Sequence, residues 1–192
     1  MKSISRNAQV LHYLLCADPG VGRTKLANYA YLADLEARKY LGRPISAFRY
    51  RFDSHGPFDA RAFCAATREM EQAGLATESE VGVGDYIEHR LMPTSRGIEY
   101  GFTLAEAKVL DYVVQTYLST NAREICVDIV YQTEPMMKAK RGQLVPMSIV
   151  DRVPGKNLGF DLERMLAGEA DAKAGRTRPL DAVVSELRAR TQ

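Results

Sequence analysis

The spacing of apolar residues along the first half of the chain predicts a helical core with one hairpin. Apolar positions that recur every three or four residues are typical of helices, and strict alternation is typical of strands. The predicted elements are helices at 5–16, 24–41 and 59–72, a short strand at 47–52, a turn at 54–57 and a hairpin at 76–93. This order of helix, helix, short strand, helix and hairpin is that of a winged helix-turn-helix.

Residues that start and stop helices support these boundaries. Thr24 is a candidate N-cap for the second helix, and Gly42 suits its C-terminus. Asp59 is placed to open the third helix, which Gly74 stops. The second half begins with a strong helix at 103–118, where Thr103 and Glu106 have the spacing of a capping box.

The remaining second-half pattern predicts a helix at 122–131 and a shorter one at 161–166. The fold class that follows is mainly α with a small β-hairpin (α+β). We expect one domain over 1–167, with a winged-helix-like core at about 5–95 and a helical part at about 103–167. A linker at 168–178 and a C-terminal helix at 179–192 complete the predicted organisation.

Composition is that of an ordinary globular protein. The 192 residues are 46% hydrophobic and 26% charged, with a formal net charge of +2, so a core can form without disulfides or metals. The three cysteines, Cys16, Cys64 and Cys126, are far apart and indicate reduced core thiols. The start of the chain lacks a signal-peptide block, and no stretch has the length of a membrane span, so we expect a cytoplasmic protein with no membrane partner.

Candidate chemistry is sparse, and we expect no enzyme, no catalytic residues, no metal and no cofactor. Asp53, Ser54 and His55 have the residue types of a hydrolytic triad, but adjacent residues do not normally reach one another in catalytic geometry. Residues 17–25 lack the strand, the first glycine and the lysine of a phosphate-binding loop. An enzyme using His55 is kept as a third hypothesis.

The charge distribution distinguishes between two kinds of partner, DNA and another protein. The outward face of the third helix carries Arg61 and Arg68 and could enter a DNA major groove. The hairpin is acidic, however, because four carboxylates oppose the single Arg90, and such a wing would be repelled by phosphates. We therefore favour a protein partner, with DNA binding as the alternative. The carboxylates are those of Glu78, Glu80, Asp85 and Glu88.

Several short motifs resemble the Panacea (SocA-like antitoxin) family, or the related phage-associated winged-helix-like group. They are the segment 25–33, the His55-Gly56-Pro57 turn, the Gly74-Leu75 helix end and the segment 134–140, and they extend over roughly 24–147. The resemblance implies an antitoxin that neutralises a cognate toxin by direct binding, and the toxin is expected to be the product of a nearby bacterial or phage gene in a toxin-antitoxin system. The candidate partner-binding residues are Arg51, His55, Phe58, Arg61, Arg68, Lys138, Lys140 and Arg141.

Two questions stay open at this level. The basic residues at 138–141 are either a solvated loop or a docking patch for an acidic surface. The apolar stripe of the last helix, at 180–190, also offers a surface for a homodimer.

Overall fold

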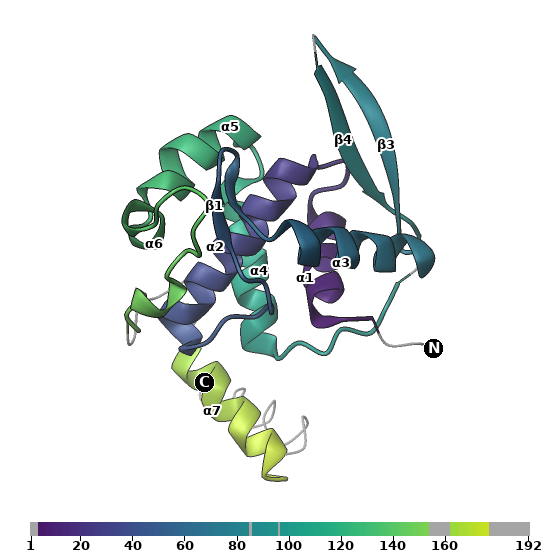
Figure 1. Ribbon diagram of the computed structural model, residues 1–192. Coiled ribbons are helices and arrows are strands. Elements are labelled where there is room, and N and C mark those ends of the chain that lie inside the picture. Colours follow the sequence, from purple (N-terminus) through teal and green to yellow (C-terminus); the bar gives the residue numbers. More distant parts are fainter. Residues whose placement is uncertain (1–3, 85, 96, 154–161, 177–192) are drawn as a thin grey trace, which may run out of the picture.

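A computed structural model describes residues 4–84, 86–95, 97–153 and 162–176. Four helices carry the fold, and a long hairpin projects from them (Figure 1). The helices are α1 (Arg6–Ala17), α2 (Arg23–Leu41), α3 (Ala60–Gln72) and α4 (Leu104–Tyr117), and the hairpin strands are β3 (Ala76–Val83) and β4 (Tyr86–Pro93). The predicted fold class, mainly α with a small β component, is confirmed; the winged-helix assignment stays a prediction.

The predicted helix ends are largely local and match the structure. Ser5 caps α1 by accepting from the backbone of Ala8, and Asp59 caps α3. Thr103 and Glu106 form the predicted capping box at α4. Gly42 ends α2 with a φ of 74°, in the left-handed region that favours glycine.

The prediction that Thr24 caps α2 is wrong. The N-cap lies two residues earlier, at Gly22, and the helix begins at Arg23. The reason lies in the hairpin: Leu91 of β4 donates its N–H to the carbonyl of Val21 at 3.1 Å, and Gly22 forms a bridge with Arg90. The chain therefore enters α2 directly from an extended segment that β4 holds in place.

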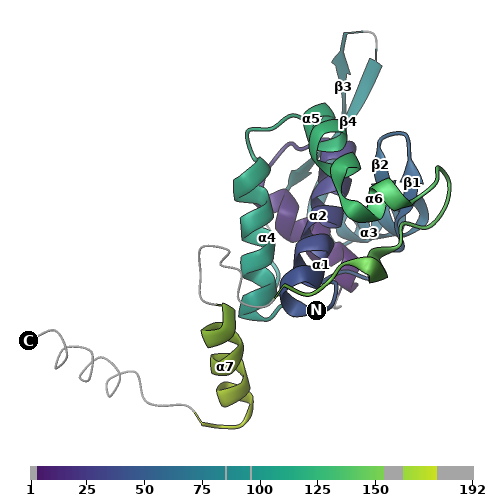
Figure 2. The same cartoon turned by 90° about the vertical axis from the view of Figure 1, so that its left-hand side faces the viewer.

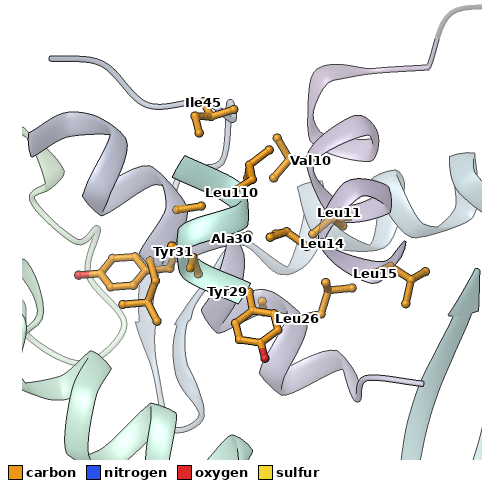
Figure 3. Packing of buried hydrophobic residues seen from close by; sticks show 14 of the residues in the cluster. Val10, Leu11, Leu14, Leu15, Leu26, Tyr29, Ala30, Tyr31, Ile45 and Leu110 are labelled. Carbon is orange, nitrogen blue, oxygen red and sulfur yellow. The ribbon is translucent and has the colours of Figure 1, made fainter. Parts of the chain in front are cut away.

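One core unites the two halves of the chain. Leu11 and Leu14 of α1, Leu26 of α2 and Leu110 of α4 are all fully buried in the same cluster (Figure 3). Because α4 packs against both α1 and α2, the predicted winged-helix-like core shares its interior with the helical part.

A second, smaller hairpin lies between α2 and α3. It consists of β1 (Arg51–Asp53) and β2 (Gly56–Phe58), paired antiparallel. The predicted strand at 47–52 is too long, and the predicted turn at 54–57 overlaps β2. The segment before β1 is bound to a buried carboxylate instead of a sheet: Asp34 accepts from the backbone N–H groups of Ile45 and Ser46, each at 2.8 Å.

The helix predicted at 122–131 is divided into three helical turns of different pitch. They are α5 (Ala122–Glu124), the π-helical segment η1 (Ile125–Ile129) and the 3₁₀ segment η2 (Val130–Gln132), followed by α6 (Glu134–Lys138). A short 3₁₀ turn, η3 (Met147–Ile149), comes later. A π-helical turn is rare and is frequently found at functional sites.

The last described element is α7 (Leu162–Lys173), which contacts α4 at the end of the molecule opposite the β3–β4 hairpin (Figure 2). It continues seven residues beyond the predicted helix at 161–166, so residues 168–173 of the predicted linker are helical. The predicted C-terminal helix at 179–192 lies outside the described residues.

Candidate functional site

A cleft of about 590 Å³ opens beside the projecting hairpin. Its walls come from four separate parts of the chain: β4, the first turn of α2, the turn between β1 and β2, and the α5–η1 run. Figure 1 shows the β3–β4 hairpin and α5 toward the same end of the molecule. A cleft of this size at the junction of several elements is a common form of binding site.

The hairpin wall is less acidic than the sequence indicates. Arg23 of α2 pairs with Glu78, with 2.5 Å between Nε and Oε1, and Nδ1 of His89 lies 3.5 Å from the same Oε1 atom. Arg90 pairs with Glu88 at 2.8 Å. Glu78 and Glu88 therefore both have basic partners, and Arg23, a partner of Glu78, comes from another element.

Glu88 also covers the N-terminus of α2. A Cβ atom on Gly22 would collide with the Glu88 carboxylate, so a glycine at this position allows the close approach. A negative charge is favourable at a helix N-terminus, where free backbone N–H groups give a partial positive charge. The start of α2 is thus already matched by a carboxylate of the same chain.

The opposite wall is the helical run. Arg123 and Val127 lie one helical turn apart on it, and both side chains are exposed. Cys126 is buried between them, and burial raises the pKa of its thiol while a hydrogen bond with Tyr131 opposes this shift. A thiol of this kind is an inert core group.

Two exposed apolar side chains from different elements line this cleft. Ile87 on β4 is 61% exposed, and Val127 on η1 is 45% exposed. Arg123, beside Val127, makes no ion pair within the described ranges. The cleft therefore combines apolar contact surface with an available positive charge.

His55 lies in the turn between β1 and β2, which lines part of the cleft. Its Nδ1 atom is 3.3 Å from the Ser54 hydroxyl and 3.7 Å from an Asp53 carboxylate oxygen. A catalytic triad uses one imidazole nitrogen for the hydroxyl and the other for the carboxylate. Here both neighbours face the same nitrogen, so the three residues lack the geometry of a proton relay.

The other predicted partner-binding residues fall into separate regions. Arg61 and Arg68 are exposed on the outward face of α3. Arg51 donates to the carbonyl of Gly142 at 3.2 Å, which places it beside the exposed Lys140 and Arg141.

Two predicted residues are already engaged within the chain. Lys138 pairs with Glu134 at 2.6 Å. Phe58 is half-buried and packs on Phe63, with 5.3 Å between ring centroids. Of the eight predicted residues, only His55 lines the cleft.

A second cluster was overlooked in the sequence, although its signal was local. His12 and Cys16 lie one helical turn apart on α1, with 3.6 Å between Nε2 and Sγ, and Nδ1 of His12 is 2.7 Å from the Tyr100 hydroxyl. Burial lowers the pKa of His12, against an opposing hydrogen bond with the Leu75 backbone. Desolvation likewise raises the pKa of Cys16, which is exposed and so is not the predicted core thiol. The pair is neutral and joins α1 to its neighbours.

Comparison of the chain with protein-family models, curated proteins and solved structures finds no match in any of the three. The Panacea resemblance stays a prediction from motifs. Within the described ranges, no helix has the length and apolar character needed to cross a membrane. No group of three or more metal-ligating side chains gathers in that part of the chain either.

Proposed function

We propose that this chain is a cytoplasmic, antitoxin-like protein that binds and neutralises a protein toxin through the cleft beside the hairpin. The observation that carries the proposal is the pair of exposed apolar side chains, Ile87 of β4 and Val127 of η1, that line one cleft. Exposed apolar groups rimmed by polar residues are typical of surfaces that bind another protein. The motifs that resemble Panacea domains supply the antitoxin role.

Charge favours an acidic contact surface on that partner. Arg123 is available at the cleft, and Arg51, Lys140 and Arg141 add positive charge on the outer side of the β1–β2 hairpin. Complementary charge steers association and rejects partners of the wrong sign. This arrangement supports the docking-patch interpretation of the basic residues near 140.

Co-expression with the product of the neighbouring gene tests the proposal. If that product arrests growth, the wild-type chain should restore growth, and the Ile87→Asp/Val127→Asp variant should not, because buried carboxylates in an apolar contact are costly. Leu104→Asp is the matched control, since Leu104 is 57% exposed in the first turn of α4 and does not line the cleft. Equal rescue by the cleft variant and the control would exclude the cleft as the binding surface.

A DNA-binding regulator is the second candidate, and the ion pairs of the hairpin favour it more than the sequence did. Neutralisation of Glu78 by Arg23 and of Glu88 by Arg90 weakens the electrostatic objection to a wing beside phosphates.

Fluorescence anisotropy with the chain's own promoter DNA at low salt tests this candidate. Arg61→Ala/Arg68→Ala should abolish binding, and Arg176→Ala, which alters a residue paired with Asp171 just beyond α7, should not. Absence of binding by the wild-type chain at low salt would remove the DNA hypothesis.

A further inference from the structure

The edge of β4 that faces away from β3 is paired over only part of its length. Leu91 donates its N–H to Val21 and accepts from the N–H of Gly20, at 3.1 and 3.0 Å. Alternate residues of a strand direct their backbone groups to the same edge, so those of His89 and Ile87 point the same way as those of Leu91. Within the described residues, pairing along this edge ends at the bridge between Gly22 and Arg90.

The unpaired part of this edge opens into the cleft. Ile87, Glu88 and His89 are consecutive in β4, and all three line the cleft. Successive side chains of a strand point to opposite faces, so three in a row reach the same space only if the edge of the strand faces it. Unpaired N–H and C=O groups on such an edge are a template for another strand.

The other walls of the cleft leave this edge accessible, and the positive charge of Arg123 favours an acidic ligand. Arg123 and Val127 present one face of the helical run toward the cleft, and His55 contributes from the β1–β2 turn. The open stretch from Tyr86 to His89 spans about 13 Å at roughly 3.3 Å a residue, enough for about four residues of an extended peptide.

We propose that a short extended acidic segment of a protein partner adds to β4 as a third strand, in line with residues 20–22. Backbone hydrogen bonds to Ile87 and His89 supply affinity, and alternate side chains supply specificity. Apolar side chains of the segment pack against Ile87 and Val127, and its carboxylates face Arg123. This proposal rests on the proposed function only in assigning the segment to the toxin.

Fluorescence anisotropy with labelled octapeptides tests strand addition directly on the full chain. The first probe alternates valine and glutamate, the second replaces glutamate with lysine, and the third carries N-methyl groups on alternate amides of the acidic sequence. Saturable binding of the acidic probe is expected, at least tenfold weaker for each of the other two. Equal binding of the methylated and unmethylated probes, or no saturable binding of the acidic probe, would overturn the proposal.

Variants of Ile87 test the same site from the protein side. Ile87→Pro removes an N–H that points away from β3 and so leaves the β3–β4 ladder intact, whereas Ile87→Val keeps that N–H. The proline variant should lose at least tenfold in affinity and the valine variant should not. If circular dichroism shows that the proline variant is unfolded, the methylated probe still decides the question.

The remaining outcomes separate this proposal from the proposed function and from self-association. A concentration-dependent dimer that Ile87→Pro abolishes, measured by sedimentation, would assign the edge to a second copy of this chain and overturn peptide addition. Peptide binding without growth rescue would support strand addition and count against the antitoxin role. Growth rescue that persists in the Ile87→Pro variant, with no peptide binding, would support the antitoxin role and count against strand addition.

Discussion

Replacement of Asp34 by alanine tests whether one buried carboxylate holds the segment that leads into the β1–β2 hairpin. Asp34 is 1% exposed, and it accepts from the backbones of Ile45 and Ser46, the Ser46 hydroxyl and the Tyr50 hydroxyl. Burial raises the pKa of this carboxyl, and hydrogen bonds from Ser46, Tyr50 and Ile45 oppose the shift. The hairpin that follows carries His55 into the cleft.

The magnitude follows from the donors that alanine would leave without an acceptor. Four donors point at the carboxylate, and each buried donor without a partner costs at least about 1 kcal/mol, so Asp34→Ala should lose about 4 kcal/mol of unfolding free energy. For a chain of this size that loss corresponds to a fall in Tm of about 8–16 °C.

Urea denaturation of a double-mutant cycle provides the assay. Tyr50→Phe alone should cost about 1 kcal/mol, because it removes one hydrogen bond to the carboxylate. In the Asp34→Ala background the same change should cost nothing, because the Tyr50 hydroxyl has already lost its acceptor. A loss below about 1.5 kcal/mol for Asp34→Ala, or an equal cost of Tyr50→Phe in both backgrounds, would refute the reasoning.

Three further predictions concern stability. Burial opposes ionisation of Glu106, but hydrogen bonds from Arg6, the Thr103 backbone and Arg43 outweigh it and lower the pKa below the ordinary 4.5. These bonds therefore contribute their full stabilisation above about pH 4.5, and the contribution is lost as the pH falls through the folded-state pKa. Urea denaturation at several pH values should show this dependence, and Glu106→Gln should abolish it. Gly56→Ala should cost about 2–3 kcal/mol by thermal unfolding, because φ is 109° and a Cβ would collide with the Asn28 side chain; an unchanged Tm would contradict this account. Gly42→Ala, at a φ of 74°, should cost about 1 kcal/mol, whereas Gly82→Ala, whose Cβ would meet open space, is the matched control with little change.

Much of the fold could be predicted because its signals are local. Asp59, Gly42 and the Thr103–Glu106 box define helix ends through contacts within three or four residues of the chain. The hairpin at 76–93 follows from alternation and a turn, and its bounds match β3 and β4. Such features depend on backbone geometry and neighbouring side chains, so a single sequence contains the information.

The errors occur where distant segments compete with local preference. Thr24 has the chemistry of an N-cap, but pairing of residues 20–22 with β4 moves the start of α2 to Arg23. Residues 47–50 alternate like a strand, yet side chains outside any sheet bind the backbone before β1: Asn7 accepts from the N–H of Ala47, and Asp59 accepts from that of Arg49. In each case a contact with a residue far along the chain outweighs the local pattern.

The sequence by itself determined the helices, the hairpin and the surface position of His55, because periodicity and turn chemistry act over a few residues. Only the tertiary structure decided that His55, Ile87 and Val127 share one cleft and that Arg23 neutralises Glu78 of the hairpin. These groups lie tens of residues apart, so their proximity depends on how α1, α2 and α4 pack into one core. No local spacing in the sequence records that packing.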